Sequence, residues 1–261
     1  MRRFSQDRPR GCLRDSMTRL TVLSPHRDDA VFSLYLSLQK WCQSGVRVSV
    51  VNFFTVSNYA PKVSVNQTEK ISLIRKTEDH DVLSGIHKKI RIQDSDLLDA
   101  PLRLGIGFES ICRPETQALA RSAEPEIAAY IRSQASKDLL IAPLGLGGHV
   151  DHLAVYEAAI ASVSRKQHIA FYEDLPYAIW TGDKVLRNRV LETETKLHVR
   201  LKPVIIRQRR AAFRKQRAAA GYKSQITPEE ASSIARFSFR YRGGERLWVP
   251  KYSKLWKLLT H

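Results

Sequence analysis

Short apolar runs rich in β-branched residues alternate along this chain with longer segments that repeat with helical periodicity. The apolar runs are predicted strands and cover 20–25, 46–56, 137–145 and 168–176. The segments between and after them are predicted helices and cover 30–45, 66–85, 124–136 and 152–165. Such alternation joins parallel strands through helical crossovers, so the sequence predicts an α/β fold with a doubly wound, mostly parallel sheet.

The length predicts one domain with flanking segments. With 261 residues, of which 43% are hydrophobic, the chain can bury one substantial core. We expect a disordered basic leader over 1–18, with Met17 as an alternative start, and a catalytic domain over 19–230. We expect a basic extension over 231–261 that packs on this domain. The stretch 86–123 has scattered prolines and glycines and is predicted to be irregular, on the substrate side.

The net charge of +17 favours anionic partners, such as phosphorylated substrates, nucleic acid or a membrane surface. Cys12, Cys42 and Cys112 form a sparse, odd set, which argues against a disulfide scaffold and fits a reducing compartment. No run approaches the roughly 18 apolar residues of a membrane span, and the basic N-terminus lacks the apolar core of a secretory signal. We therefore predict a cytoplasmic protein.

Three polar clusters follow predicted strands: "HRDD" at 26–29, "GLGGHVDH" at 145–152 and "YEDLPY" at 172–177. In open α/β sheets ligands bind outside the carboxyl ends of the strands, so these clusters are expected to converge at one edge. No Walker loop or G-x-G-x-x-G motif is present, which gives little support to a nucleotide site. The clusters are the candidate functional site.

Histidine and aspartate together suit a divalent metal, and catalytic zinc takes three protein ligands with one open position. His26 and Asp29 could bind from the first cluster, and His152 could complete the set. Asp28 would then be free to act as a general base. The alternative is structural: an aspartate after a strand is commonly a helix N-cap, and a lone histidine is commonly a core or surface residue.

Two further residues of the second cluster have candidate roles. A protonated His149 could stabilise an oxyanion or donate a proton to a leaving amine. Asp151 could orient and charge that histidine, as carboxylates behind metal-site histidines do.

"SPHRDDAVFS" together with "GGHVDH" resembles the LmbE/PIG-L family of zinc-dependent N-deacetylases, which act on N-acetylglucosaminyl and other amino sugars. The resemblance implies His26, Asp29 and His152 as metal ligands and Asp28 as general base. It also implies His149 as the electrophilic or acid histidine, supported by Asp151. It further implies a Rossmann-like fold, a Zn²⁺ cofactor and hydrolysis of an N-acyl group, and the same donors accept Fe²⁺.

Weaker segments agree with this resemblance. "RKTED" at 75–79 resembles a substrate-facing arginine helix, which makes Arg75 a binding candidate. "LLDAPLR" at 97–103 and "GYKSQ" at 221–225 resemble family segments near the site. Arg27 departs from the family pattern, and it is either an exposed turn residue or an anion contact beside the metal. Ala30 replaces a glutamate that is not a ligand.

The strand-end residues Glu173 and Asp174 could contact sugar hydroxyls, and Tyr172 or Tyr177 could line the pocket, with Glu173 and Tyr172 as the candidate substrate contacts; the alternative is a polar turn. The expected function is a metal-dependent hydrolase that removes an N-acetyl group from an amino sugar or sugar-containing metabolite. We expect a small-molecule partner, with a lean towards an anionic one, and no specific nucleic acid; the oligomeric state is not readable. Alternatives are an amidase on a thiol conjugate or glycosylated antibiotic, and a non-catalytic basic binder of nucleic acid or membrane surfaces.

Overall fold

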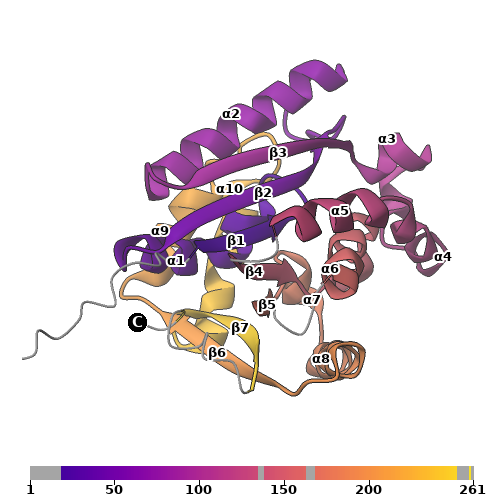
Figure 1. Cartoon of the computed structure of the whole chain (residues 1–261). Coiled ribbons are helices and arrows are strands. Elements are labelled where there is room, and N and C mark those ends of the chain that lie inside the picture. Colours follow the sequence, from indigo (N-terminus) through magenta and orange to yellow (C-terminus); the bar gives the residue numbers. More distant parts are fainter. Residues whose placement is uncertain (1–18, 135–137, 163–167, 252–258, 260–261) are drawn as a thin grey trace, which may run out of the picture.

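The centre of the computed structural model is a seven-stranded sheet with the order β3-β2-β1-β4-β5-β7-β6 (Figure 1). The structure describes residues 19–134, 138–162, 168–251 and 259. The strands are β1 (Arg19–Ser24), β2 (Arg47–Val56), β3 (Arg91–Leu98), β4 (Asp138–Pro143), β5 (His168–Tyr172), β6 (Leu201–Arg207) and β7 (Gly244–Pro250). Strands β1 to β5 run parallel, and β7 is antiparallel to both of its neighbours.

Helices cover both faces of this sheet (Figure 1). The helices are α1 (Asp29–Gln43), α2 (Thr68–Ile86), α3 (Ala100–Leu104), α4 (Pro114–Gln117), α5 (Glu124–Gln134), α6 (Val150–Ser162), α7 (Tyr177–Trp180), α8 (Asp183–Leu197), α9 (Ala211–Ala219) and α10 (Pro228–Arg236). Helix α1 contacts α2 and α9, whereas α5 and α6 pack together on the other face. Since both faces are covered, β1 is buried along almost its whole length, as central parallel strands are. The predicted α/β fold with a mostly parallel sheet in one domain is confirmed.

One predicted irregular region contains a strand. Within 86–123, residues Arg91–Leu98 form β3, which pairs with β2 alone at the edge of the sheet. Its sequence, RIQDSDLL, alternates polar and apolar residues weakly because an edge strand is covered less than a central one. The prediction missed β3 for this reason.

The C-terminal region is also more integrated than expected. The predicted boundary at residue 230 falls inside α10, and β7 inserts between β5 and β6. Strand β7 is therefore part of the central sheet and does not pack on a domain that is complete without it. A sequence pattern cannot show that β7 pairs with β5 and β6. The expected leader, 1–18, lies outside the described residues. No helix in the described part of the chain is long and apolar enough to cross a membrane.

Helix α1 is interrupted at Leu34, whose backbone (φ −130°, ψ 17°) is not helical. Glu245 of β7 accepts hydrogen bonds there from the amides of Leu36 (3.1 Å) and Ser37 (2.9 Å). Lys215 of α9 donates to the same carboxylate at 2.7 Å, and both charged side chains are buried. This pair joins β7 and α9 to the helix that begins at Asp29.

Replacing Lys215 with methionine should lower the free energy of unfolding by about 3–5 kcal/mol, because Glu245 would remain as a buried charge without its cation. Lys196→Met is the matched control. It removes a half-exposed lysine that pairs with Glu157 and Glu192, and it should cost about 1 kcal/mol or less. Denaturant unfolding of both variants measures the difference. Equal losses of unfolding free energy would contradict the view that Lys215 compensates the buried charge of Glu245.

Candidate active site

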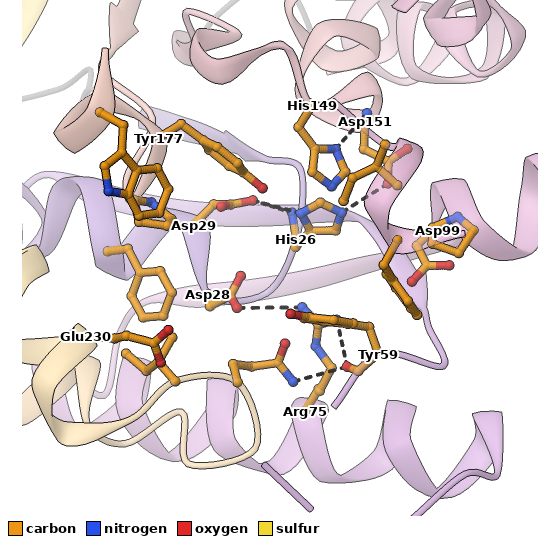
Figure 2. Close-up of a pocket in the computed structure, with 18 residues that line it drawn as sticks. His26, Asp28, Asp29, Tyr59, Arg75, Asp99, His149, Asp151, Tyr177 and Glu230 are labelled. Carbon is orange, nitrogen blue, oxygen red and sulfur yellow. Dashed lines mark hydrogen bonds and ion pairs between the residues drawn. The ribbon is translucent and has the colours of Figure 1, made fainter. Parts of the chain in front are cut away.

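A cavity of about 300 Å³ opens at the carboxyl ends of the parallel strands (Figure 2). The residues that line it come from the predicted clusters and from several loops: His26, Asp28, Asp29, Phe32, Tyr59, Arg75, Asp99, Pro101, Phe108, Ile111, His149, Asp151, Pro176, Tyr177, Trp180, Gln225, Ile226 and Glu230. The structure therefore brings the first two clusters into one cavity, as the strand-end rule predicts. The third cluster joins them through Asp174 and Tyr177.

The turn from β1 into α1 positions His26, Asp28 and Asp29. Asp28 occupies the N-cap position, yet its side chain makes no capping hydrogen bond. The Asp29 carboxylate accepts the backbone N–H of His26 at 2.8 Å. The N-cap alternative for Asp28 therefore does not account for its carboxylate, which faces the cavity instead (Figure 2).

His152, in the first turn of α6, is fully buried between two carboxylates. Its Nδ1 lies 2.8 Å from Asp174 Oδ1, and its Nε2 lies 3.2 Å from Asp29 Oδ2. Nε2 has no hydrogen-bond partner among the described residues. A buried nitrogen without a partner is costly unless something absent from the protein chain occupies its lone pair.

His26 also lies between two carboxylates. Its Nδ1 lies 3.2 Å from the same Asp29 oxygen, and its Nε2 lies 3.0 Å from Asp151 Oδ2. Each histidine thus has a carboxylate behind one ring nitrogen and Asp29 in front of the other. Metal-binding histidines are oriented in this way, with the far nitrogen donating to a carboxylate.

The charges around these histidines are strongly coupled. Burial lowers the pKa of His26, but hydrogen bonds to Asp151 and Asp29 outweigh it and raise the pKa to about 9. Burial also acts against a charged His152, yet Asp29 and Asp174 hold its pKa well above the ordinary value. Burial raises the pKa of Asp29, but the positive charges of His152 and His26 bring it below its usual range. The protein fold therefore collects carboxylates that require positive charge at this point.

The donor atoms of His26, Asp29 and His152 fit a metal ion. All three lie within 4.8 Å of one another. Two ligand atoms at 2.0–2.1 Å from a tetrahedral metal lie about 3.3 Å apart, close to both measured separations from Asp29 Oδ2. His26, His149 and Asp151 form a second candidate set. It fits less well, since the Asp151 carboxylate also accepts from Ala100 N (2.9 Å) and Arg103 (2.8 Å).

Asp28 lies beside this centre and faces Arg75 of α2, with 3.6 Å between Oδ2 and Nη2. Burial and the neighbouring Asp29 raise the pKa of Asp28, and the Arg75 guanidinium opposes this. Arg75 itself donates to Ser57 Oγ at 3.0 Å and lines the cavity. Asp28 is thus a carboxylate at the cavity wall, outside the best ligand set, with a raised proton affinity.

His149 also lines the cavity, but its environment differs from the predicted one. Burial and the positive charges of His26 and His152 lower its pKa well below the ordinary value, so the ring is neutral. Its Nδ1 accepts the backbone N–H of Asp151 at 3.1 Å, which places the ring proton on Nε2. The Asp151 carboxylate supports His26 rather than His149: it lies 3.0 Å from His26 Nε2, whereas His149 meets only the backbone N–H of Asp151.

Of the predicted substrate contacts, the structure brings Arg75 to the cavity and places three elsewhere. The Arg27 guanidinium is buried against Thr55, Ser72 and Asp94. Glu173 accepts hydrogen bonds from Tyr241, Arg246 and Trp248, and Tyr172 donates to the Leu23 carbonyl at 3.1 Å. The C-terminal strand β7 supplies Arg246 and Trp248 to Glu173, whereas Tyr172 is directed towards β1.

Other cavity residues were not predicted individually. Asp99 and Gln225 lie in the two segments that resemble family sequences, so those segments were a usable signal. Tyr177 lines the cavity, as its cluster allowed. Trp180, which is 73% exposed, and Glu230 carried no signal in the sequence. Asp174 was considered as a sugar contact, whereas it lies behind His152.

Comparison with known proteins places this chain in a family. The family described as GlcNAc-PI de-N-acetylase (PIG-L) matches residues 21–163. 2′-N-acetylparomamine deacetylase from Streptomyces fradiae is 28% identical over 162 residues, which are 61% of this chain and 58% of that protein. The match thus spans less than two thirds of that relative's length.

Solved structures share the fold. The zinc-inhibited form of teicoplanin deacetylase Orf2 has a TM-score of 0.67 at 23% identity, covering 90% of this chain and 100% of that one. N,N′-diacetylchitobiose deacetylase from Pyrococcus horikoshii has a TM-score of 0.60 at 17% identity, with 89% and 84% covered. At these identities the structural likeness shows the fold alone. Because the family match covers more than half of its length, the chain belongs to the PIG-L (LmbE-like) family.

Proposed function

We propose that this protein is a metal-dependent N-deacetylase that removes an acetyl group from an amino sugar or a sugar-containing metabolite. The observation that carries the proposal is the donor set of His26, Asp29 and His152, with a carboxylate behind each histidine and with Asp28, outside this set, at the cavity wall. Relatives named as deacetylases of paromamine, teicoplanin and chitobiose compounds support it.

The residues can divide the hydrolysis of an amide among them. A zinc ion held by His26, Asp29 and His152 would polarise the acyl carbonyl and lower the pKa of a water molecule, and iron(II) suits the same donors. Asp28 would take a proton from the attacking water and return it to the departing amine. The neutral His149, with its proton on Nε2, would donate a hydrogen bond to the developing oxyanion. The products are acetate and a free amine.

The test is acetate release from N,N′-diacetylchitobiose and 2′-N-acetylparomamine by the zinc-loaded protein. Release that stops on chelation and returns with zinc is the expected result. No release from either compound, in a protein that holds zinc, would count against an amino-sugar N-acetyl substrate.

The charge of the cavity favours a neutral or cationic substrate over an anionic one. Among the described lining residues, five carry carboxylates and one, Arg75, carries a guanidinium, so the carboxylates outnumber the positive charges even when the two charges of a bound zinc ion are added. The positive net charge of the whole chain therefore does not extend to this cavity, and the expected lean towards an anionic substrate has no support there.

Glu230→Gln should test this selectivity. Glu230 lines the cavity and also closes a capping box with Thr227, which glutamine maintains, so the change removes charge while preserving the cap. Chitobiose with one acetyl and one free amino group is cationic, whereas the diacetyl form is neutral. We expect the variant to raise KM for the cationic form about two- to fivefold and to leave the neutral form unchanged.

The control for this experiment is Glu229→Gln, a change at the neighbouring exposed residue that does not line the cavity. It should alter neither KM. An equal effect of Glu230→Gln on both substrates would contradict a role for its charge in selectivity.

A further inference from the structure

Arg27 is a buried arginine, 4% exposed, in the turn that also holds His26, Asp28 and Asp29. Its side chain does not line the cavity. Nη1 donates to the carbonyl of Thr55 in β2 (2.8 Å) and of Ser72 in α2 (3.0 Å), and Nη2 pairs with Asp94 of β3 (3.0 Å). One guanidinium thus connects the turn to three separate elements.

Ser72 belongs to a chain of hydrogen bonds that leads back to the cavity. Its Oγ accepts the Ser57 amide at 3.1 Å and donates to the Ser57 carbonyl at 3.3 Å. The Ser57 Oγ accepts from Arg75 Nη1 at 3.0 Å, and Arg75 Nη2 reaches Asp28 at 3.6 Å. Since Arg27 and Asp28 are consecutive residues, these contacts close a ring: Arg27, Ser72, Ser57, Arg75, Asp28.

The backbone of Arg27 is held by the same buried polar layer. Tyr222 lies with its hydroxyl 3.3 Å from the Arg27 carbonyl and 2.8 Å from Asp79 Oδ1. Asn52 donates to Asp79 at 2.9 Å and to Asp94 at 3.2 Å. Both ends of Arg27 are therefore fixed by groups from β2, α2, β3 and the loop after α9.

We propose that Arg27 is a positioning residue that sets the contact between Arg75 and Asp28. It holds α2 at a fixed register against the β1–α1 turn, and through Ser57 it directs the Arg75 guanidinium towards the Asp28 carboxylate. An arginine suits this task because its planar fork reaches a carboxylate and two carbonyls in fixed directions, whereas a lysine presents one compact ammonium. The catalytic consequence rests on the proposed deacetylase function, whereas the structural ring does not.

The experiment uses Arg27→Lys, Arg75→Met and the double variant, with N,N′-diacetylchitobiose as substrate and zinc content measured in each. Arg27→Lys should lower kcat about tenfold while changing KM less than twofold, because misplacing a catalytic group costs rate more than binding. In the Arg75→Met background the same change should cost less than about twofold, since Arg27 acts through Arg75. Zinc content should stay at the wild-type level.

Arg246→Lys is the matched control. Arg246 is a partly buried arginine that pairs with Glu173, away from the cavity. The Arg246→Lys substitution should change kcat by the same factor in the wild type and in the Arg75→Met background. If Arg27→Lys does not fold, Asp94→Asn removes the ionic partner of Arg27 and should show the same non-additivity with Arg75→Met.

Hydrogen exchange of the zinc-free proteins gives a readout that needs no substrate. The Ser57 amide is bonded to Ser72 Oγ, and the Tyr59 amide is bonded to Ser57 Oγ at 3.0 Å. Both should exchange faster in Arg27→Lys than in the wild type. Unchanged exchange, or additive effects on kcat, would overturn the proposal. If exchange is faster but the wild-type protein releases no acetate, the positioning role of Arg27 in the ring is supported and the proposed deacetylase function is wrong.

Discussion

Asp28→Asn is expected to reduce the turnover of the zinc-loaded protein by about 10²- to 10⁴-fold, the usual contribution of a general base. The amide has the size of the carboxylate but cannot take a proton from water. Asp28 is not in the best metal-donor set, and its side chain makes no capping hydrogen bond, so zinc binding and the start of α1 should both persist. Steady-state acetate release with zinc analysis on the same preparations measures the two effects.

In the zinc-free protein, the same substitution should leave the melting temperature unchanged or higher. Burial and Asp29 raise the pKa of Asp28 in the folded protein, so its ionised form is disfavoured at neutral pH relative to the unfolded chain. This cost is absent below the unfolded pKa and develops as the pH rises above it, and asparagine removes it. Asp81→Asn, at a largely exposed carboxylate of α2, is the control and should keep full activity. Full activity in Asp28→Asn would reject Asp28 as the base.

His152→Ala should abolish both zinc binding and activity. The ring supplies the buried Nε2 that has no hydrogen-bond partner among the described residues, and it stands between Asp29 and Asp174. Its loss leaves the buried Asp174 without its cationic partner and leaves Asp29 with His26 alone, which should also destabilise the protein by about 3–5 kcal/mol. Elemental analysis of zinc per chain and denaturant unfolding measure the two consequences.

Asp174→Asn separates the metal effect from the loss of stability. The ring of His152 remains, but the carboxylate behind its Nδ1 becomes an amide, so zinc affinity should fall about 10- to 100-fold without being lost. His168→Ala, at an exposed position of β5, should bind zinc like the wild type. Retention of zinc by His152→Ala would contradict the ligand assignment and favour the alternative set of His26, His149 and Asp151.

The sequence by itself predicted the parallel sheet and the residues at its functional edge. Strand and helix periodicity are properties of neighbouring residues, so β1, β2, β4 and β5 were recognisable without knowing their partners. The rule that strand ends carry ligands then indicated where His26, Asp28, Asp29 and His152 would meet. That placement needs only the strand order and direction, which short crossovers largely determine.

Only the tertiary structure decided which partner each side chain has. Glu173 and Asp174 are adjacent in one polar turn, yet Glu173 binds Arg246 and Asp174 binds His152. The difference depends on β7, which joins the sheet from the far end of the chain and covers one side of that turn. Asp151 likewise contacts His26, which is 125 residues away, through its carboxylate, and it meets the nearby His149 only through its backbone N–H.

Arg27 shows most clearly that the sequence does not reveal the partners of a side chain. In the sequence it is a charged residue in a catalytic turn, and both an exposed position and an anion contact were reasonable interpretations. In the structure its three acceptors come from β2, α2 and β3, and burial makes those contacts obligatory because an unpaired guanidinium in the core is costly. The sequence thus determined the chemistry available at the sheet edge, and the packing of distant elements determined which groups are free to use it.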